Sequence, residues 1–301
     1  MKFVTAEYNQ ESFVGMVDQE ETKVLCLNIA QEARTGQKNF PSTMLECIAD
    51  ESFINDVSGL LDWIQTKENT DSFYIPLEKV RLLAPIPKPS KNIFCVGKNY
   101  AEHAIEMGSA ADIPEHIMVF TKAPTTVIGM NETVLHHQNV TNELDYEGEL
   151  AVIIGKKGRG IKKEEALDYI FGYTILNDVT ARDLQMRHKQ FFIGKSLDAT
   201  CPMGPWIVHK SIIENPNHLT IETKINGEIR QSSNTKNFIF PIEEVISVLS
   251  AGMTLEPGDI IATGTPAGVG KGFKPPKFLS SGDKMEVTIE KIGSLKNTIQ
   301  E

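Results

Sequence analysis

The sequence lacks the patterns that mark several large classes of protein. It has four widely scattered cysteines, Cys26, Cys47, Cys95 and Cys201. Since none of them forms a CxxC pair, neither a disulfide scaffold nor a thiolate zinc site is expected. No apolar run approaches the ~20 residues that span a bilayer, and the first residues lack the apolar core of a secretory signal. We therefore expect a cytoplasmic protein with no membrane partner.

Tracts rich in Lys and Arg are also missing, and the formal net charge of the 301 residues is −10 at pH 7. A protein dedicated to nucleic acid needs a basic surface to meet the phosphates, so we expect no nucleic-acid partner. The remaining composition, 41% hydrophobic and 23% charged, is that of an ordinary globular protein with a sizeable core.

A small N-terminal α+β domain is predicted over residues 1–85. Two short apolar runs, 13–17 and 24–29, precede a stretch from Met44 to Ile64 in which apolar residues recur at helical intervals. The segment APIPKPSKN at 84–92 follows, and its three prolines force an extended backbone. This segment marks the boundary with a second domain over residues 86–301.

The second domain contains many short strand-like segments separated by Gly and Pro. Strands are expected at 92–96, 149–154, 171–176, 221–225, 228–231, 260–263 and, as the last one, 284–289; helices are expected at 163–169 and 242–250. Asn226-Gly227 predicts a type I′ hairpin. Because alternating βα units are too rare for a Rossmann sheet, we predict a β-rich α+β fold, rolled or barrel-like.

The densest chemical signal is the segment LDYEGEL, which contains Glu147 and Glu149. Side chains two residues apart on a strand point to the same face, so these two carboxylates project together. Like charges this close raise one pKa unless a cation lies between them. The alternative is a solvated strand end with exposed glutamates.

Asp178 is the candidate for a third ligand, in the segment NDVTARDLQ that follows a strand and opens a helix. Its alternative role is that of a helix N-cap. Three carboxylates with no nearby cysteine form an all-oxygen site, which suits Mg²⁺ or Mn²⁺ better than Zn²⁺ or copper.

A third element is the segment GKNYAEHAIE, in which His103 and Glu106 share one face if the segment is helical. A carboxylate beside an imidazole raises its basicity, which suits a base. The alternative is an incidental surface pair. Residues 108–116 that follow are polar and predict a mobile lid.

The glycine-rich loop ATGTPAGVG at 262–270 fits neither a Walker A loop nor GxGxxG. Its backbone N–H groups and the Thr265 hydroxyl instead suit a carboxylate, and the alternative is a tight structural turn.

Together these segments closely resemble the fumarylacetoacetate hydrolase family. The matching stretches are GKNYAEHAIE, LDYEGELAVIIG, GYTILNDVTARDLQ, FFIGKSLDATCPMGP, INGEIRQ and GDIIATGTPAGVG. They occur in the family's order and cover about two thirds of the chain. The N-terminal residues resemble the short module of bacterial members, closest to oxaloacetate decarboxylases. The resemblance implies a mixed β-roll catalytic domain and a homodimer.

The resemblance also implies roles for individual residues. Glu147, Glu149 and Asp178 would bind Mg²⁺ or Mn²⁺, and a His103–Glu106 dyad would activate water or shuttle protons. Lys195 would face the substrate, and the other predicted substrate contacts are Arg182, Gln185, Thr265, Gly264 and Lys122. One position departs from the family: animal fumarylacetoacetase has a fourth aspartate ligand where this chain has Val96.

The expected activity is metal-dependent cleavage of a C–C bond in a small 2-oxo acid, with the bonding electrons held as a metal-stabilised enolate. Decarboxylation of oxaloacetate ranks first and fits the departure at Val96. Hydrolysis of acylpyruvates such as fumarylpyruvate or acetylpyruvate ranks second, and a 2-hydroxymuconate-type isomerase or decarboxylase of aromatic catabolism ranks third. An alternative of another class is an interaction protein on an enzyme scaffold.

Overall fold

The N-terminal part of the chain is an α+β module, as predicted. In the computed structural model, which describes residues 1–300, it contains strands β1 (Lys2–Tyr8), β2 (Glu11–Val17), β3 (Lys23–Cys26), β4 (Tyr74–Pro76) and β5 (Arg81–Leu82). Its helices are α1 (Leu27–Thr35), α2 (Met44–Ala49) and α3 (Phe53–Gln65), with 3₁₀ turns at Asp71–Phe73 and Leu77–Lys79. The stretch with helical spacing is thus divided into two helices, because the Asp50 backbone N–H closes α2 on the Glu46 carbonyl.

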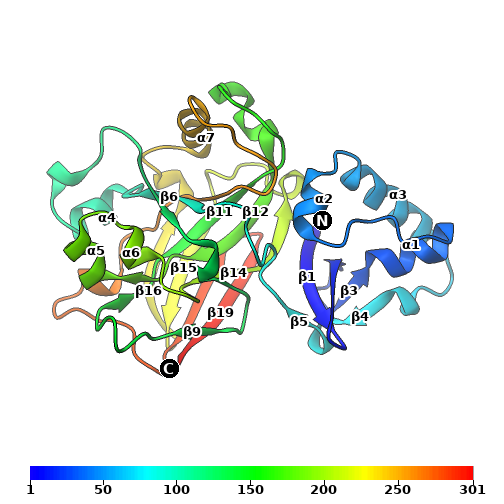
Figure 1. Ribbon diagram of the computed structural model, residues 1–301, viewed down its shortest axis with the longest axis horizontal. Coiled ribbons are helices and arrows are strands. Elements are labelled where there is room, and N and C mark those ends of the chain that lie inside the picture. Colours follow the sequence, from blue (N-terminus) through cyan, green and yellow to red (C-terminus); the bar gives the residue numbers. More distant parts are fainter. Residues whose placement is uncertain (301) are drawn as a thin grey trace.

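The strands of this module belong to a 12-stranded mixed sheet that also carries much of the remaining chain. Its order is β4-β3-β2-β1-β14-β12-β11-β17-β6-β7, with β5 beside β1 and β8 beside β14. The added strands are β6 (Ile93–Gly97), β7 (Met118–Lys122), β8 (Val127–Ile128), β11 (Gly148–Ile154), β12 (Ile170–Asn177), β14 (Cys201–His209) and β17 (Ile260–Ala262). Lys2 pairs with Val208 where β1 meets β14, so the blue N-terminal module in Figure 1 extends the sheet sideways. The domain boundary at residues 85 and 86 stays a prediction.

A second sheet of five strands has the order β16-β15-β18-β19-β9. Its members are β9 (Thr133–Leu135), β15 (Thr220–Ile225), β16 (Glu228–Asn234), β18 (Lys284–Ile289) and β19 (Gly293–Gln300). Asn226 and Gly227 have φ angles of 53° and 83°, as the predicted hairpin requires. The expectation that 284–289 is the last strand was wrong, since β19 follows it. The apolar alternation of β19 is interrupted by Asn297, which is buried because its amide donates to the Gly129 and Glu132 carbonyls.

The other helices are short, apart from α7 (Ile242–Ser250), whose bounds are those predicted from sequence. The short helices are α4 (Ala101–Glu106), α5 (Arg182–His188) and α6 (Phe192–Lys195). A separate two-stranded sheet is formed by β10 (Leu144–Asp145) and β13 (Thr180–Ala181). The expected helix at 163–169 is a 3₁₀ helix, Lys163–Tyr169. Further 3₁₀ turns lie at Ala110–Asp112, Pro124–Thr126, Lys210–Ile212, Thr235–Asn237 and Gly270–Gly272.

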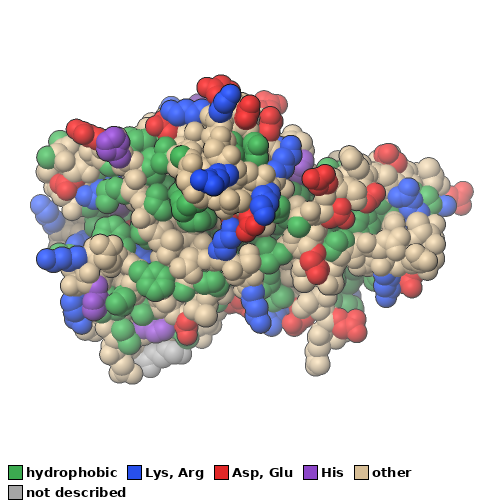
Figure 2. All heavy atoms as spheres, turned by 45° about the horizontal axis from the view of Figure 1, so that its top comes forward, with side chains coloured by type: hydrophobic (Ala, Val, Ile, Leu, Met, Phe, Trp, Pro, Cys, Tyr) green, Lys and Arg blue, Asp and Glu red, His purple; other side chains and the backbone are tan. Residues whose placement is uncertain are grey.

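Strand β11 is buried on both faces, which fixes the position of the carboxylates at its start. Leu150 and Val152 face a core shared with α7 and the five-stranded sheet, whereas Ala151 and Ile153 face a core shared with the N-terminal helices. The structure confirms the β-rich α+β fold, a mixed β-roll. No helix among residues 1–300 is long and apolar enough to cross a bilayer. Figure 2 shows acidic and basic side chains interspersed over the visible face.

Candidate active site

The three predicted carboxylates converge because β11 and β12 are paired in a fixed register. Gly148 lies opposite Asn177, and the Asp178 backbone N–H donates to the Glu147 carbonyl at 2.8 Å. One carboxylate oxygen from each of Glu147, Glu149 and Asp178 lies within 4.8 Å of the others. Their exposed fractions are 4%, 1% and 0%, so the glutamates are not a solvated strand end. Asp178 is no helix cap either, since α5 begins at Arg182 after Ala181.

Buried cations surround this carboxylate cluster. The Lys195 ammonium lies 2.6 Å from Glu147 Oε2 and 2.7 Å from Asp178 Oδ2. The Lys122 ammonium lies 2.9 Å from Asp178 Oδ1, and a guanidinium nitrogen of Arg182 lies 2.7 Å from Glu147 Oε1. Burial disfavours the charged form of Lys195, but the negative charges of Asp178 and Glu147 outweigh it and raise its pKa.

The pKa values of the two glutamates are shifted in opposite directions. Burial opposes ionisation of Glu147, but the adjacent charges of Lys195 and Arg182 prevail and lower its pKa to about 2. Burial and the negative charges of Asp178 and Glu147 hold the pKa of Glu149 well above its ordinary value. Among residues 1–300, no Lys, Arg or His lies at ion-pair distance from Glu149, and its one hydrogen bond is donated by the Gly264 N–H at 2.7 Å. An ionised Glu149 would therefore have no cation among residues 1–300 to balance its charge, and the all-oxygen donors of the cluster fit a hard divalent cation.

His103 and Glu106 form a pair on α4, as the helical spacing predicts. His103 Nδ1 lies 3.4 Å from Glu106 Oε2, and the imidazole is buried. Glu106 also accepts hydrogen bonds from the Gly268 N–H, at 2.9 Å to Oε1 and 3.1 Å to Oε2. The pair is thus attached to the glycine-rich loop and is not an incidental surface contact.

The glycine-rich loop lies against the start of β11. The Thr265 hydroxyl donates to the Gly148 carbonyl at 2.9 Å and accepts a hydrogen bond from the Gln231 amide at 2.7 Å. Gly264 has a φ of 100°, and a Cβ there would lie 2.7 Å from the Cβ of Asn99. The hydrogen bonds of Thr265, Gly264 and Lys122 are made with other groups of the protein. Their contacts with a substrate stay predictions.

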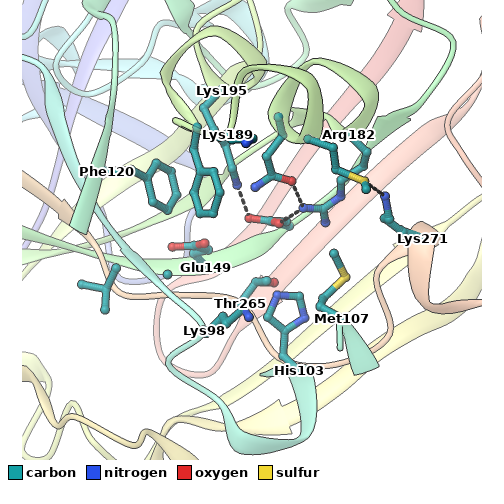
Figure 3. A pocket seen from close by; sticks show the side chains of 16 residues that line it. Lys98, His103, Met107, Phe120, Glu149, Arg182, Lys189, Lys195, Thr265 and Lys271 are labelled. Carbon is teal, nitrogen blue, oxygen red and sulfur yellow. Dashed lines mark hydrogen bonds and ion pairs between the residues drawn. The ribbon is translucent and has the colours of Figure 1, made fainter. Parts of the chain in front are cut away.

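A cavity of about 420 Å³ opens over these groups. Seven of the predicted residues line it: His103, Glu147, Glu149, Arg182, Gln185, Lys195 and Thr265. Figure 3 shows Lys195 and Arg182 on one side of the cavity and His103 with Thr265 on the other. Asp178, Glu106, Gly264 and Lys122 are not in its lining and support residues that are. The cavity therefore brings an imidazole, a buried ammonium group and the two glutamates to one place.

Sequence reasoning missed Asp145, which is fully buried beside the site. Its Oδ2 accepts a hydrogen bond from Arg182 Nε at 2.9 Å, and its Oδ1 accepts one from the Gly270 N–H at 2.7 Å. Asp145 lies two residues before Glu147, so the alternation that selected the two glutamates extends to it. The lining residues Lys98, Phe120, Lys189 and Lys271 were also missed. Lys98 lies in the segment GKNYAEHAIE, whereas no sequence pattern marks the other three.

Comparison with known proteins agrees with this geometry. The family described as "Fumarylacetoacetate (FAA) hydrolase C-terminal" matches residues 92–300. Oxaloacetate tautomerase YisK of Bacillus subtilis (strain 168) is 58% identical over 301 residues, which cover 99% of this chain and 100% of that protein. A fumarylacetoacetate hydrolase from psychrophilic Exiguobacterium antarcticum is 40% identical, with a TM-score of 0.81 and coverage of 100% and 99% of the two chains.

A 2-hydroxyhepta-2,4-diene-1,7-dioate isomerase from Mycobacterium marinum is also similar. It is 30% identical, with a TM-score of 0.74, and the match covers 100% of this chain and 98% of that one. Sequence and structure therefore agree that this chain belongs to the fumarylacetoacetate hydrolase family of enzymes.

Proposed function

We propose that this enzyme interconverts the enol and keto tautomers of oxaloacetate, with Mg²⁺ or Mn²⁺ held by Glu147, Glu149 and Asp178. The observation that carries the proposal is that His103 and Lys195 line the same cavity as the two glutamates. The 58% identity to a protein named oxaloacetate tautomerase supports the choice of substrate. The sequence predicts a reaction through the enolate of a small 2-oxo acid. Tautomerisation and decarboxylation of oxaloacetate both use such an enolate.

Tautomerisation moves one proton from the enol oxygen to the neighbouring carbon, with no water consumed and no CO₂ released. His103 is the group that accepts and returns this proton. The Glu106 carboxylate near Nδ1 favours the imidazole tautomer with its proton on Nδ1, so Nε2 is free to exchange a proton with the substrate.

The remaining residues bind the substrate and stabilise negative charge. A bound divalent cation supplies Lewis-acid stabilisation of an enolate oxygen. Lys195, held by Glu147 and Asp178, contributes a second fixed positive charge, and burial strengthens its effect. Arg182 and Gln185, joined by a 3.2 Å hydrogen bond, orient a substrate carboxylate.

Decarboxylation of oxaloacetate is the second candidate, because the buried Lys195 charge also favours the enolate that remains when CO₂ leaves. In that reaction the bond between the methylene carbon and the distal carboxylate breaks. Its electron pair becomes the enolate of pyruvate, which then takes up a proton. The two reactions differ only in whether a C–C bond breaks.

One assay separates these activities. The enol form of oxaloacetate absorbs in the ultraviolet, so its loss reports tautomerisation, while pyruvate release reports decarboxylation. Both are measured with Mg²⁺, with Mn²⁺ and with a chelator. We expect enol loss faster than the metal-only rate and abolished by chelator. His103→Asn should lower this rate about a hundredfold, whereas His218→Asn, at an exposed position, should leave it unchanged.

The other outcomes have separate meanings. Pyruvate release well above the metal-only rate favours the decarboxylase, and formation of pyruvate and acetate from acetylpyruvate favours the hydrolase. If none of these substrates reacts and the chain still has a cellular role that survives Glu149→Gln, the proposal of an interaction protein takes its place.

A homodimer is also part of the proposal. Met118 and Val119 are exposed on β7, an edge strand, and Phe192 and Ile193 are exposed on the adjoining helix α6. An apolar group on an unpaired sheet edge is typical of a surface covered by a partner. The molar mass in solution tests this, and Val119→Lys should shift the protein toward monomer.

A further inference from the structure

Five cationic side chains line the cavity. They are Lys98, Lys189, Lys271, Arg182 and Lys195. Arg182 and Lys195 are balanced by the buried carboxylates of Asp145, Glu147 and Asp178, so the positive charge left to attract a ligand is that of the other lysines. The chain as a whole has a net charge of −10. A concave site whose charge opposes that of the whole protein concentrates ligands of the opposite sign, here anions.

Among residues 1–300, two of these lysines have no acidic partner. Lys98 is paired with Asp112 at 3.2 Å. In the described part of the chain, no carboxylate lies within 4.0 Å of the Lys189 or Lys271 ammonium; the recorded hydrogen-bond acceptor of Lys271 is the Met186 sulfur at 2.7 Å. A thioether is a weak acceptor for an ammonium ion, so this contact is easily replaced by an anionic ligand.

The backbone positions both lysines beside the substrate-binding groups. The Lys271 N–H donates to Asp145 Oδ2 at 3.1 Å, and the same oxygen accepts from Arg182. Lys189 follows α5 with a φ of 58°, a left-handed conformation that is uncommon for residues other than glycine. Figure 3 labels both lysines among the side chains that line the cavity. Both side chains therefore border the cavity that Arg182 and Lys195 also line.

We infer that Lys189 and Lys271 bind the distal carboxylate of a dicarboxylic 2-oxo acid and so select dianionic substrates over monoanionic ones. The inference rests on the proposed function, which places the 2-oxo acid group beside the metal ligands. A substrate with a single carboxylate leaves both lysines unsatisfied. Each charge-assisted hydrogen bond that a second carboxylate accepts favours binding.

The test compares a dianionic and a monoanionic substrate in the holoenzyme with Mn²⁺. The variant is Lys189→Gln/Lys271→Gln. The dianion is oxaloacetate, and the monoanion is pyruvate, whose enolisation is followed by exchange of its methyl protons in D₂O. We expect KM for oxaloacetate to rise about tenfold, with KM for pyruvate changed less than twofold. The dependence of kcat/KM on ionic strength should become weaker for oxaloacetate only.

Two further proteins serve as controls. Lys189→Arg/Lys271→Arg keeps both charges and should restore most of the preference for the dianion. Lys88→Gln removes one charge at an exposed position in the segment before β6, and it should behave as wild type. An equal rise of KM for both substrates, or no rise for either, overturns the inference.

Binding separates this inference from the proposed function. The shift of the thermal midpoint by 2-oxoglutarate, a stable dicarboxylic 2-oxo acid, is compared with the shift by pyruvate in the wild type and in the glutamine variant. Loss of the 2-oxoglutarate shift alone supports the inference even if no substrate turns over. If oxaloacetate is turned over and 2-oxoglutarate shifts the midpoint equally in wild type and in the glutamine variant, the inference fails while the proposed function stands.

Discussion

Glu106 is held by the backbone N–H of Gly268, which lies 2.9 Å from one carboxylate oxygen and 3.1 Å from the other. This contact joins helix α4 to the loop that follows β17, so the position of the His103 partner depends on a segment more than 160 residues away. A second glycine of the same loop, Gly272, leaves room for the carboxylate: a Cβ there would lie 2.1 Å from Oε1 of Glu106.

Gly272→Ala should displace the Glu106 carboxylate and lower kcat about tenfold or more, because His103 loses its oriented partner. The obstructed group is the end of a flexible side chain, so the free energy of unfolding should change little. Steady-state kinetics and thermal unfolding check the two parts. Gly252→Ala is the matched control, since nothing lies within 4 Å of its Cβ position. Wild-type kcat in Gly272→Ala would contradict the role given to Glu106.

Asp145→Asn should raise KM about tenfold, because the amide places a donor toward Arg182 or leaves this guanidinium with only one of its two carboxylate partners. Breaking a buried ion pair also lowers the free energy of unfolding by about 3 kcal/mol. Asp259→Asn is the control. Asp259 is another buried aspartate, and its Oδ2 lies 2.8 Å from the Lys91 ammonium. It does not line the cavity. It should destabilise the protein with KM unchanged. Equal KM effects in both variants would show that Asp145 acts through stability alone.

Glu149→Gln should stabilise the metal-free protein and abolish metal-dependent activity. Burial and the neighbouring Asp178 and Glu147 charges raise the pKa of Glu149, so a neutral amide of the same shape removes the repulsion while still accepting the Gly264 N–H. Thermal unfolding with chelator should give a higher midpoint than wild type, and added Mn²⁺ should raise the midpoint of wild type only. A midpoint of Glu149→Gln below that of wild type in chelator would contradict the repulsion between Glu149 and the charges of Asp178 and Glu147.

His209 should make the protein sensitive to acid. Burial first, then the N-terminal amine and Lys210, lower its pKa from 6.5 to about 4. The imidazole binds its proton at a higher pH in the unfolded chain than in the folded protein. Neutral His209 therefore makes its full contribution to the free energy of unfolding above pH 6.5, and this contribution is lost as the pH falls from about 6.5 to about 4. Protonation also removes the acceptor that Nδ1 offers to the Ser211 N–H.

The free energy of unfolding of wild type and His209→Gln, measured by urea from pH 7.5 to pH 4, checks this prediction. The wild type should lose more stability than the variant over that interval. His218→Gln, at an exposed position, should keep the wild-type dependence. Parallel curves for wild type and His209→Gln would contradict the assignment.

Local structure was determined by the sequence wherever one short segment carries the whole signal. Helix α7, the Asn226-Gly227 hairpin and strand β11 follow from periodicity, turn chemistry and β-branched residues within a few positions. The resemblance to the family also named seven of the residues that line the cavity. Strand β19 was missed, because the partners of Asn297 that allow its burial come from residues far away in the chain.

Only the tertiary structure decided how the charged groups are arranged. The register that places Gly148 opposite Asn177 sets the distance between Glu147 and Asp178, and no spacing in the sequence encodes a pairing between strands. The same holds for Asp145 beside Arg182, and for Lys189 and Lys271, which line one cavity although they are far apart in the sequence. Periodicity reports the face of a single element, whereas charge compensation depends on which elements pack together.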